Sequence, residues 1–266
     1  MSKRTIEEIM DELRNRSRLS QGDKPEESAA KRYDCPKCKD ELGFIERRGT
    51  MEVWVSCACR EWRKAQKLLK SSEITEQFKN LNFAQFKTKG KHQSVKEAYE
   101  CAVEYVQAYR DIRESRKNSI ALLGRPGSGK THLLTAAANE LMRKLFVPVL
   151  YFPFVEGFND LKQDFSLLED KLNRMKQVEV LFLDDLFKPV GGRPRATEWQ
   201  IEQTYAVVNY RYLNHKPIML SSELSVEEIV SIDEALGTRL VEMCQDFLVI
   251  VNGSSFGINH RLEGMV

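Results

Sequence analysis

The run GRPGSGKT at residues 124–131 has the residue types and spacing of a phosphate-binding loop. It matches G-x-x-x-x-G-K-[ST] in full and stands between an apolar run and a helical pattern. Glycines let successive backbone N–H groups face phosphate oxygens, and the N-terminus of the next helix adds partial positive charge. Lys130 would neutralise the β- and γ-phosphates, and Thr131 would ligate Mg²⁺. The pattern predicts that ATP or ADP is held by Gly124, Pro126, Gly127, Ser128, Gly129, Lys130, Thr131 and His132.

An acidic pair follows a second apolar run. Residues 178–183 (VEVLFL) lead directly into Asp184 and Asp185. An acid at the end of a neighbouring strand suits the magnesium shell of a phosphoryl-transfer site, so Asp184 is the predicted magnesium partner. Asp185 is the predicted general base that polarises the attacking water. Either carboxylate could instead simply cap the strand end. Many ATPases carry a glutamate at the position of Asp185. Because the aspartate side chain is shorter and reaches less far, we expect slow, switch-like hydrolysis.

Four cysteines form two close pairs, Cys35 with Cys38 and Cys57 with Cys59. Two such pairs across a hairpin can supply four thiolates to one tetrahedral zinc ion. A segment of about 30 residues is too small to bury a core without such a staple. The spacing therefore favours zinc, with a redox pair or two unrelated turns as the alternatives.

Composition bounds the class of protein. With 42% hydrophobic and 30% charged residues, the 266-residue chain can bury a core. We expect no membrane segment, because no apolar run approaches the roughly 18 residues that a span needs. The first 15 residues do not resemble a secretory signal, so we expect a cytoplasmic protein with reduced cysteines. Residues 1–90 carry 20 Lys and Arg against 15 Asp and Glu, which is compatible with nucleic-acid contact or with an ordinary solvated surface.

From residue 91 onward, helical patterns alternate with short apolar runs. Alternation of this kind predicts an α/β fold with a central parallel sheet flanked by helices. The expected strands are 119–123, 147–154, 178–183, 217–220 and 247–251, with another at 51–55. The expected helices are 95–113, 131–145, 158–175, 198–213, 226–230 and 234–243. The expected domains are an N-terminal helix and linker (1–30), a zinc-binding module (31–70), a linker (71–90) and an ATPase domain (91–266).

Taken together, the chain resembles the bacterial and phage helicase loaders of the DnaC/DnaI type, a branch of the AAA+ ATPases. The loop, the Asp184 strand end and the cysteine module followed by a basic helix carry the resemblance. Further matches are Asn-x-Arg at 209–211, Lys-Pro at 216–217, Gly-Thr-Arg at 237–239 and Arg261. The resemblance implies an AAA+ P-loop domain that uses ATP to place a hexameric replicative helicase on single-stranded DNA. It also implies a homo-oligomer formed through the AAA+ domain, with Arg239 acting on the neighbouring copy.

Two positions depart from that family. Its fourth core strand usually ends in Ser-Asn, whereas this chain has Ser222 and Glu223. A glutamate cannot donate the same hydrogen bond to a phosphate, so Ser222 is the expected nucleotide contact. Met243 stands where some relatives carry a second arginine, which leaves Arg239 alone.

Single-stranded DNA contact needs cations beside aromatic faces. The candidates are Phe158, Lys162, Phe165 and Arg174, and the loop at 191–195, although these could equally be core aromatics and a surface loop. By resemblance, the N-terminal helix and zinc module would grip the helicase. An IstB-like transposition helper and a zinc-bearing DNA-binding regulator with structural nucleotide remain as alternative functions. Relatives of the first kind generally lack the cysteine module, which favours the loader.

Overall fold

The computed structural model describes residues 33–262. Contacts divide the chain into two compact units, with the division between Arg60 and Glu61. The expected N-terminal helix lies outside the described residues. No helix in residues 33–262 is both long enough and apolar enough to cross a membrane.

The first unit contains an antiparallel hairpin of β1 (Gly43–Arg48) and β2 (Met51–Ser56). The strands pair from Gly43 opposite Ser56 to Arg48 opposite Met51, which confirms the strand expected at 51–55. Gly49, in the turn, has a φ of +65°, which suits a tight hairpin connection. Most of the hairpin's side chains are exposed, so it has little core of its own.

The second unit holds a five-stranded sheet in the order β4-β5-β6-β3-β7, with every neighbouring pair parallel. This confirms the predicted parallel sheet. Its strands are β3 (Ile120–Gly124), β4 (Val149–Pro153), β5 (Val180–Asp184), β6 (Ile218–Ser222) and β7 (Leu248–Val251). The helices are α2 (Cys59–Ser71), α3 (Gln93–Ile112), α4 (Lys130–Lys144), α5 (Phe154–Gln163), α6 (Leu168–Gln177), α7 (Glu198–Leu213), α8 (Val226–Ile232), α9 (Glu234–Cys244) and α10 (Ser255–Ile258).

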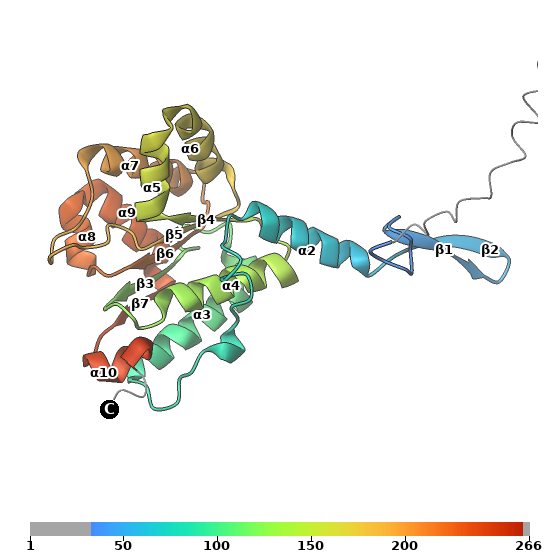
Figure 1. Ribbon diagram of the computed structural model, residues 1–266, viewed down its shortest axis with the longest axis horizontal. Helices are drawn as coiled ribbons and strands as arrows, with labels where there is room; N and C mark the ends of the chain where they lie inside the picture. The colour runs from blue at the N-terminus through green and yellow to red at the C-terminus, as the bar shows by residue number, and fades with distance from the viewer. Residues whose placement is uncertain (1–32, 263–266) are drawn as a thin grey trace, which may run out of the picture. The chain divides into compact units, whose positions relative to one another are not determined.

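Alternate residues along each strand point into two separate cores. In β3, Ile120 and Leu122 pack with α3 and α4, whereas Ala121 and Leu123 pack with α5 to α9. Figure 1 shows α3 and α4 on one side of the sheet and α5, α6, α7 and α9 on the other. Side chains alternate across a strand, so a strand buried on both faces is apolar throughout. Because the five strands are parallel, their carboxyl ends all lie at the same edge of the sheet.

The helix expected at 158–175 is two helices. α5 ends at Gln163, a short 3-10 turn follows (Phe165–Leu167), and α6 begins at Leu168. Asp164 separates them because its φ and ψ are −137° and 91°, outside the helical region. Its side chain accepts a hydrogen bond from the Ser166 N–H at 3.0 Å, as a capping residue does.

The segment expected as a linker at 71–90 instead packs against the core of the second unit. Ile74 is buried, and the ring of Phe78 lies edge-on to Tyr151 with centroids 6.2 Å apart. The side-chain amide of Asn139, in α4, donates to the carbonyl oxygens of Phe78 at 3.0 Å and Leu81 at 2.8 Å. The second unit consequently begins about 30 residues earlier than expected, because these apolar side chains complete its core.

A fully buried cation joins α7 to α6 and the start of β5. Arg211, in the Asn-x-Arg segment, donates to the carbonyl oxygens of Met175 and Val178 at 2.8 and 2.9 Å. Its other terminal nitrogen donates to the carbonyls of Glu179 at 2.9 Å and Pro217 at 2.6 Å. Burial lowers the pKa of Arg211 to about 9, which leaves it charged at neutral pH. The guanidinium thus satisfies carbonyls at a helix end and two strand starts.

Candidate nucleotide site and cysteine cluster

Three glycines shape the loop at the end of β3. Gly124, Gly127 and Gly129 have φ values of +105°, +76° and +89°, a region that L side chains rarely adopt. A Cβ on Gly124 would lie 2.4 Å from the carbonyl oxygen of Val251. Gly129 is also the N-cap of α4 and offers that helix no side-chain hydrogen bond. The first N–H groups of α4 are therefore open to an anion.

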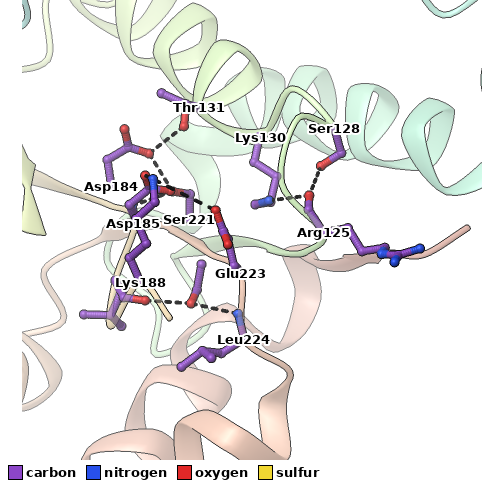
Figure 2. Close-up of polar contacts among 12 residues, drawn as sticks. Arg125, Ser128, Lys130, Thr131, Asp184, Asp185, Lys188, Ser221, Glu223 and Leu224 are labelled. Carbon is purple, nitrogen blue, oxygen red and sulfur yellow. Dashed lines mark hydrogen bonds and ion pairs between the residues drawn. The ribbon is translucent and has the colours of Figure 1, made fainter. Parts of the chain in front are cut away.

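Lys130 lies inside this loop, with 6% of its surface exposed. Its ammonium donates to the carbonyl oxygens of Gly124 at 2.6 Å and Arg125 at 2.9 Å. Figure 2 shows Lys130 near Ser128, whose hydroxyl donates to the Arg125 carbonyl at 2.9 Å. Burial lowers the pKa of Lys130 to about 8, although neighbouring carboxylates oppose the shift. A phosphate would offer this ammonium a charged acceptor in place of two neutral carbonyls.

Asp184 collects three hydroxyl groups at the end of β5. Its Oδ1 accepts from Thr131 at 2.9 Å and Ser221 at 2.5 Å, and its Oδ2 accepts from Tyr151 at 2.9 Å. Burial raises the pKa of Asp184, while these hydrogen bonds oppose the rise. The structure thus brings together the predicted magnesium pair, Thr131 and Asp184, as hard oxygen donors of the kind that Mg²⁺ prefers. Tyr151 and Ser221 were not predicted, because each lies within an apolar run that indicates only a strand.

Asp185 begins the turn after β5, with a φ of +54°. Its N–H donates to the Ser221 hydroxyl at 2.8 Å. Its Oδ2 accepts from the Lys188 ammonium at 2.5 Å, and that ammonium lies 4.0 Å from Glu223 Oε1. Figure 2 shows this group beside Asp184. The predicted base is therefore ion-paired with Lys188, which is not among the predicted site residues.

These groups line a cleft of about 810 Å³ in the second unit, a volume that suits a nucleotide-sized ligand. A different part of its lining is aromatic. The Phe86 ring lies 4.8 Å from His260 and 5.4 Å from His132, centroid to centroid. Such a wall suits stacking of a base. Phe86 is not among the predicted site residues, because the stretch at 71–90 has the composition of a linker.

Four residues predicted for the nucleotide site do not line the cleft, namely Gly124, Ser128, Ser222 and Arg239. Ser222 is fully buried, and its hydroxyl donates to the Leu186 carbonyl at 2.7 Å and accepts from the Leu224 N–H at 3.2 Å. Glu223, the next residue, lines the cleft instead. Arg239 lies in α9, where it donates to the Ala235 carbonyl at 2.6 Å. Its guanidinium lies over the rings of Tyr205 and Tyr212, at 5.4 and 5.5 Å from their centroids.

The residues considered for DNA contact divide into core and surface. Phe158 is 1% exposed and packs edge-on against Phe152 and Phe154, so the core alternative is correct for it. Phe165 is 63% exposed. Lys162 lines a separate groove of about 360 Å³ that also includes Arg195. Arg174 pairs with Glu73 at 2.5 Å.

The four cysteines of the first unit converge. Their sulfurs all lie within 4.8 Å of one another, with Cys35 and Cys57 at 3.7 Å and Cys38 and Cys59 at 3.3 Å. Four thiolates about 2.3 Å from a tetrahedral zinc ion would be separated by about 3.8 Å, so the cluster fits such an ion. The backbone N–H of Cys38 is the main reason that the pKa of Cys35 is lowered to about 7, whereas burial raises the pKa of Cys59 to about 12. The cluster can hold a metal.

The fold and site define a class of protein. Three features are characteristic of an AAA+ P-loop ATPase. They are the five-stranded parallel sheet, the phosphate loop after β3 and the acid at the end of β5. The chain belongs to the family described as IstB-like ATP binding protein, whose model matches residues 29–264. The expected fold class and ATPase class are confirmed.

Individual relatives agree with this assignment. The chain is 64% identical over 265 residues to Phage-like element PBSX protein XkdC of Bacillus subtilis (strain 168), covering 100% of both. It is 29% identical over 170 residues to Replicative helicase loader DnaI of that organism, covering 63% of this chain and 51% of the relative. A crystal structure of DnaI matches with a TM-score of 0.55 and 23% identity, over 68% of this chain and 93% of that one. A crystal structure of the DnaC helicase loader matches with a TM-score of 0.54 and 23% identity, over 67% of this chain and 100% of that one. At this identity, the structural likeness shows the fold.

Proposed function

We propose that the chain is an ATP-dependent loader that binds a replicative DNA helicase in the cytoplasm and helps place it on single-stranded DNA. The observation that carries the proposal is that one chain joins an AAA+ nucleotide cleft to a four-cysteine hairpin. Similarity to a relative named Replicative helicase loader supports it. ATP binding and hydrolysis would switch the chain between holding and releasing its partner.

In the proposed reaction, water attacks the γ-phosphorus of ATP while the bond from that phosphorus to the β–γ bridging oxygen breaks. ADP and phosphate are the products. Asp185 would accept the proton of the water, and Lys130 would neutralise charge on the phosphates. Thr131 and Asp184 would hold Mg²⁺, which supplies further positive charge to the β- and γ-phosphates.

Assembly of several copies would complete the site. Arg239 does not line the cleft of its own chain. Its guanidinium is instead held over Tyr205 and Tyr212 on α7. An arginine presented in this way could stabilise the transferring phosphoryl group in a neighbouring copy, so we propose a homo-oligomer.

The hairpin would be closed by zinc and would contact the helicase. Zinc held by Cys35, Cys38, Cys57 and Cys59 would stabilise the hairpin, most of whose side chains are exposed. Ile45 and Trp54 are a cross-strand pair on one face of the hairpin, with 63% and 56% of their surfaces exposed. Apolar side chains gathered on a small exposed hairpin are typical of a protein-binding surface.

Single-stranded DNA would be contacted near α5. Phe165 provides an exposed aromatic face, and Lys162 and Arg195 line the neighbouring groove. Exposed aromatic rings beside cations bind unpaired bases and phosphates together. Phe158 has no part in this surface, because it is buried.

Size-exclusion chromatography of the full chain with the purified hexameric helicase of the same host tests the loader. We expect co-elution in the presence of ATP and Mg²⁺. Cys38→Ser should lose co-elution, and Cys101→Ser, which changes a thiol outside the cluster, should keep it. Elution of the two proteins apart under all nucleotide conditions would count against the proposal.

A transposition helper is the second candidate, because the family description is IstB-like. Such a protein would co-elute with a transposase on duplex DNA and leave the helicase unbound. A DNA-binding regulator with structural nucleotide would release no phosphate, and Asp185→Ala would change nothing in a phosphate-release assay.

A further inference from the structure

We propose that Lys188 binds the terminal phosphate of ATP, and that Asp185 and Glu223 hold its ammonium ready beside that phosphate. The inference rests on ATP hydrolysis at this cleft, and it does not depend on which partner the chain loads. Lys188 would then be a catalytic residue, and Glu223 a positioning residue.

The turn that carries Lys188 is locked to the neighbouring strand. The Leu186 N–H donates to the Ser221 carbonyl at 2.9 Å, and the Ser222 hydroxyl donates to the Leu186 carbonyl at 2.7 Å. Leu186 and Phe187 are both fully buried. The Lys188 N–H closes the turn onto the Asp185 carbonyl at 3.2 Å. Lys188 therefore leaves a fixed backbone, and only its side chain needs to move.

Lys188 and Lys130 enter one cleft from different elements. Lys130 comes from the start of α4 and Lys188 from the turn after β5, and both line the cavity with Thr131 and Asp184. Figure 2 shows the two lysines near Asp185 and Glu223, on separate segments of the chain. The Lys188 side chain keeps 44% of its surface exposed, so an incoming oxygen can reach its ammonium. If the loop holds the β-phosphate of a triphosphate, the terminal phosphate would extend toward the Lys188 ammonium.

The carboxylates of the cleft favour a cation beside the terminal phosphate. The cavity is lined by Glu156, Asp184, Asp185 and Glu223, and by the cations Lys87, Lys130, Lys188 and Arg261. Four carboxylates beside a triphosphate would oppose binding unless cations offset them. The Lys188 ammonium lies 2.5 Å from Asp185 Oδ2 and 4.0 Å from Glu223 Oε1. Its hydrogen bond to Asp185 raises the pKa of Lys188, which keeps it protonated.

Movement of Lys188 to the phosphate would also break its ion pair with Asp185. A terminal phosphate carries more negative charge than a carboxylate and offers several oxygens, so it can compete for the ammonium. Glu223 would stay near Lys188 and limit how far it moves. Asp185 would lose its partner and become free to accept a proton from water. Binding of the terminal phosphate and release of the base would thus be one event, which ADP cannot cause.

Equilibrium binding of ADP and of a non-hydrolysable ATP analogue, measured without helicase or DNA, tests the proposal. Lys188→Met should weaken binding of the analogue by about tenfold or more, because a hydrogen bond to a charged group is lost, and leave ADP within about twofold. Lys188→Arg should restore most of the difference. Adding Glu223→Gln to Lys188→Met should recover part of the analogue's affinity, since an uncompensated carboxylate is removed.

The control is Lys67→Met, which removes an exposed lysine on α2 and should change neither dissociation constant. An unchanged ratio of the two constants in Lys188→Met would overturn the proposal. Equal loss of both nucleotides, with a lower thermal midpoint in their absence, would also overturn it, since that is the result of damage to the turn. Because no helicase is present, failure here is distinct from failure of the loader function.

Discussion

The cysteine cluster and the nucleotide cleft are built over very different lengths of chain. The cluster is drawn from Cys35 to Cys59, around one hairpin. The cleft is lined by residues from Thr75 to Arg261 and depends on which strands are neighbours in the sheet. The cluster has little apolar burial around it and is proposed to be held by a metal, whereas the cleft lies on a sheet with two hydrophobic cores. We therefore expect a substitution that disrupts one of these two sites to leave the other intact.

Loss of the proposed zinc is the largest expected effect. Cys38→Ser should abolish zinc binding and unfold the hairpin, because apparent binding energies of structural zinc are about 10 kcal/mol or more. Zinc analysis and amide NMR spectra of the full chain measure both results. The dissociation constant of ADP should stay within about twofold, since residues 61–262 contain the whole cleft.

Cys101→Ser is the matched control, because Cys101 lies in α3 and outside the cluster. It should leave zinc content unchanged. Loss of nucleotide binding in Cys38→Ser would show that the hairpin supports the cleft, and the contrast between the two sites would be wrong.

Removal of the predicted base should stop chemistry without stopping binding. Asp185→Ala should lower kcat by about 10²- to 10⁴-fold, as expected for loss of general base catalysis. Phosphate release measures the rate, and ADP binding should persist. Asp160→Ala, which removes an exposed carboxylate from α5, should have no effect on the rate. An unaltered rate in Asp185→Ala would exclude Asp185 as the base.

Substitution of the buried arginine tests how much its contacts with backbone carbonyls stabilise the second unit. Arg211→Met should lower the free energy of unfolding by about 3 kcal/mol, because buried carbonyls lose their donor. Urea unfolding of the second unit measures the change. Arg110→Met, at an exposed position of α3, should change it by less than about 0.5 kcal/mol. Equal effects of the two substitutions would refute a structural role for the Arg211 contacts.

The smallest expected effect concerns the support of Asp184. Tyr151→Phe removes the hydroxyl that donates to Asp184 Oδ2 and keeps the ring. Affinity for Mg²⁺ in the presence of ADP should fall by about tenfold, the lower end of what loss of a ligand's hydrogen-bond partner costs. Titration with Mg²⁺ measures it. Tyr109→Phe removes a hydroxyl bonded to Glu179 instead and should leave the affinity unchanged.

Sequence patterns predicted the phosphate loop and the parallel sheet better than the packing of side chains. The loop at 124–131 was predicted because its glycines and lysine are adjacent in the chain, and the parallel sheet because strand and helix patterns alternate. The break at Asp164 was not predicted, since apolar spacing continues from α5 into α6. Phe86 was missed because a short polar stretch with scattered aromatic residues resembles a linker until its partners are known.

Within the site, spacing alone identified Lys130, Thr131 and the acids at 184 and 185, because each lies in a continuous motif whose chemistry depends on local backbone geometry. The partners of those residues depended on strand order. β6 lies between β3 and β5, so Ser221 and Glu223 lie beside Asp184 and Lys188 although more than 30 residues separate them. The sequence alone determined the phosphate loop, the acids and the cysteine set. Only the tertiary structure decided which side chains surround them, because contacts across a sheet are set by strand neighbours and not by distance along the chain.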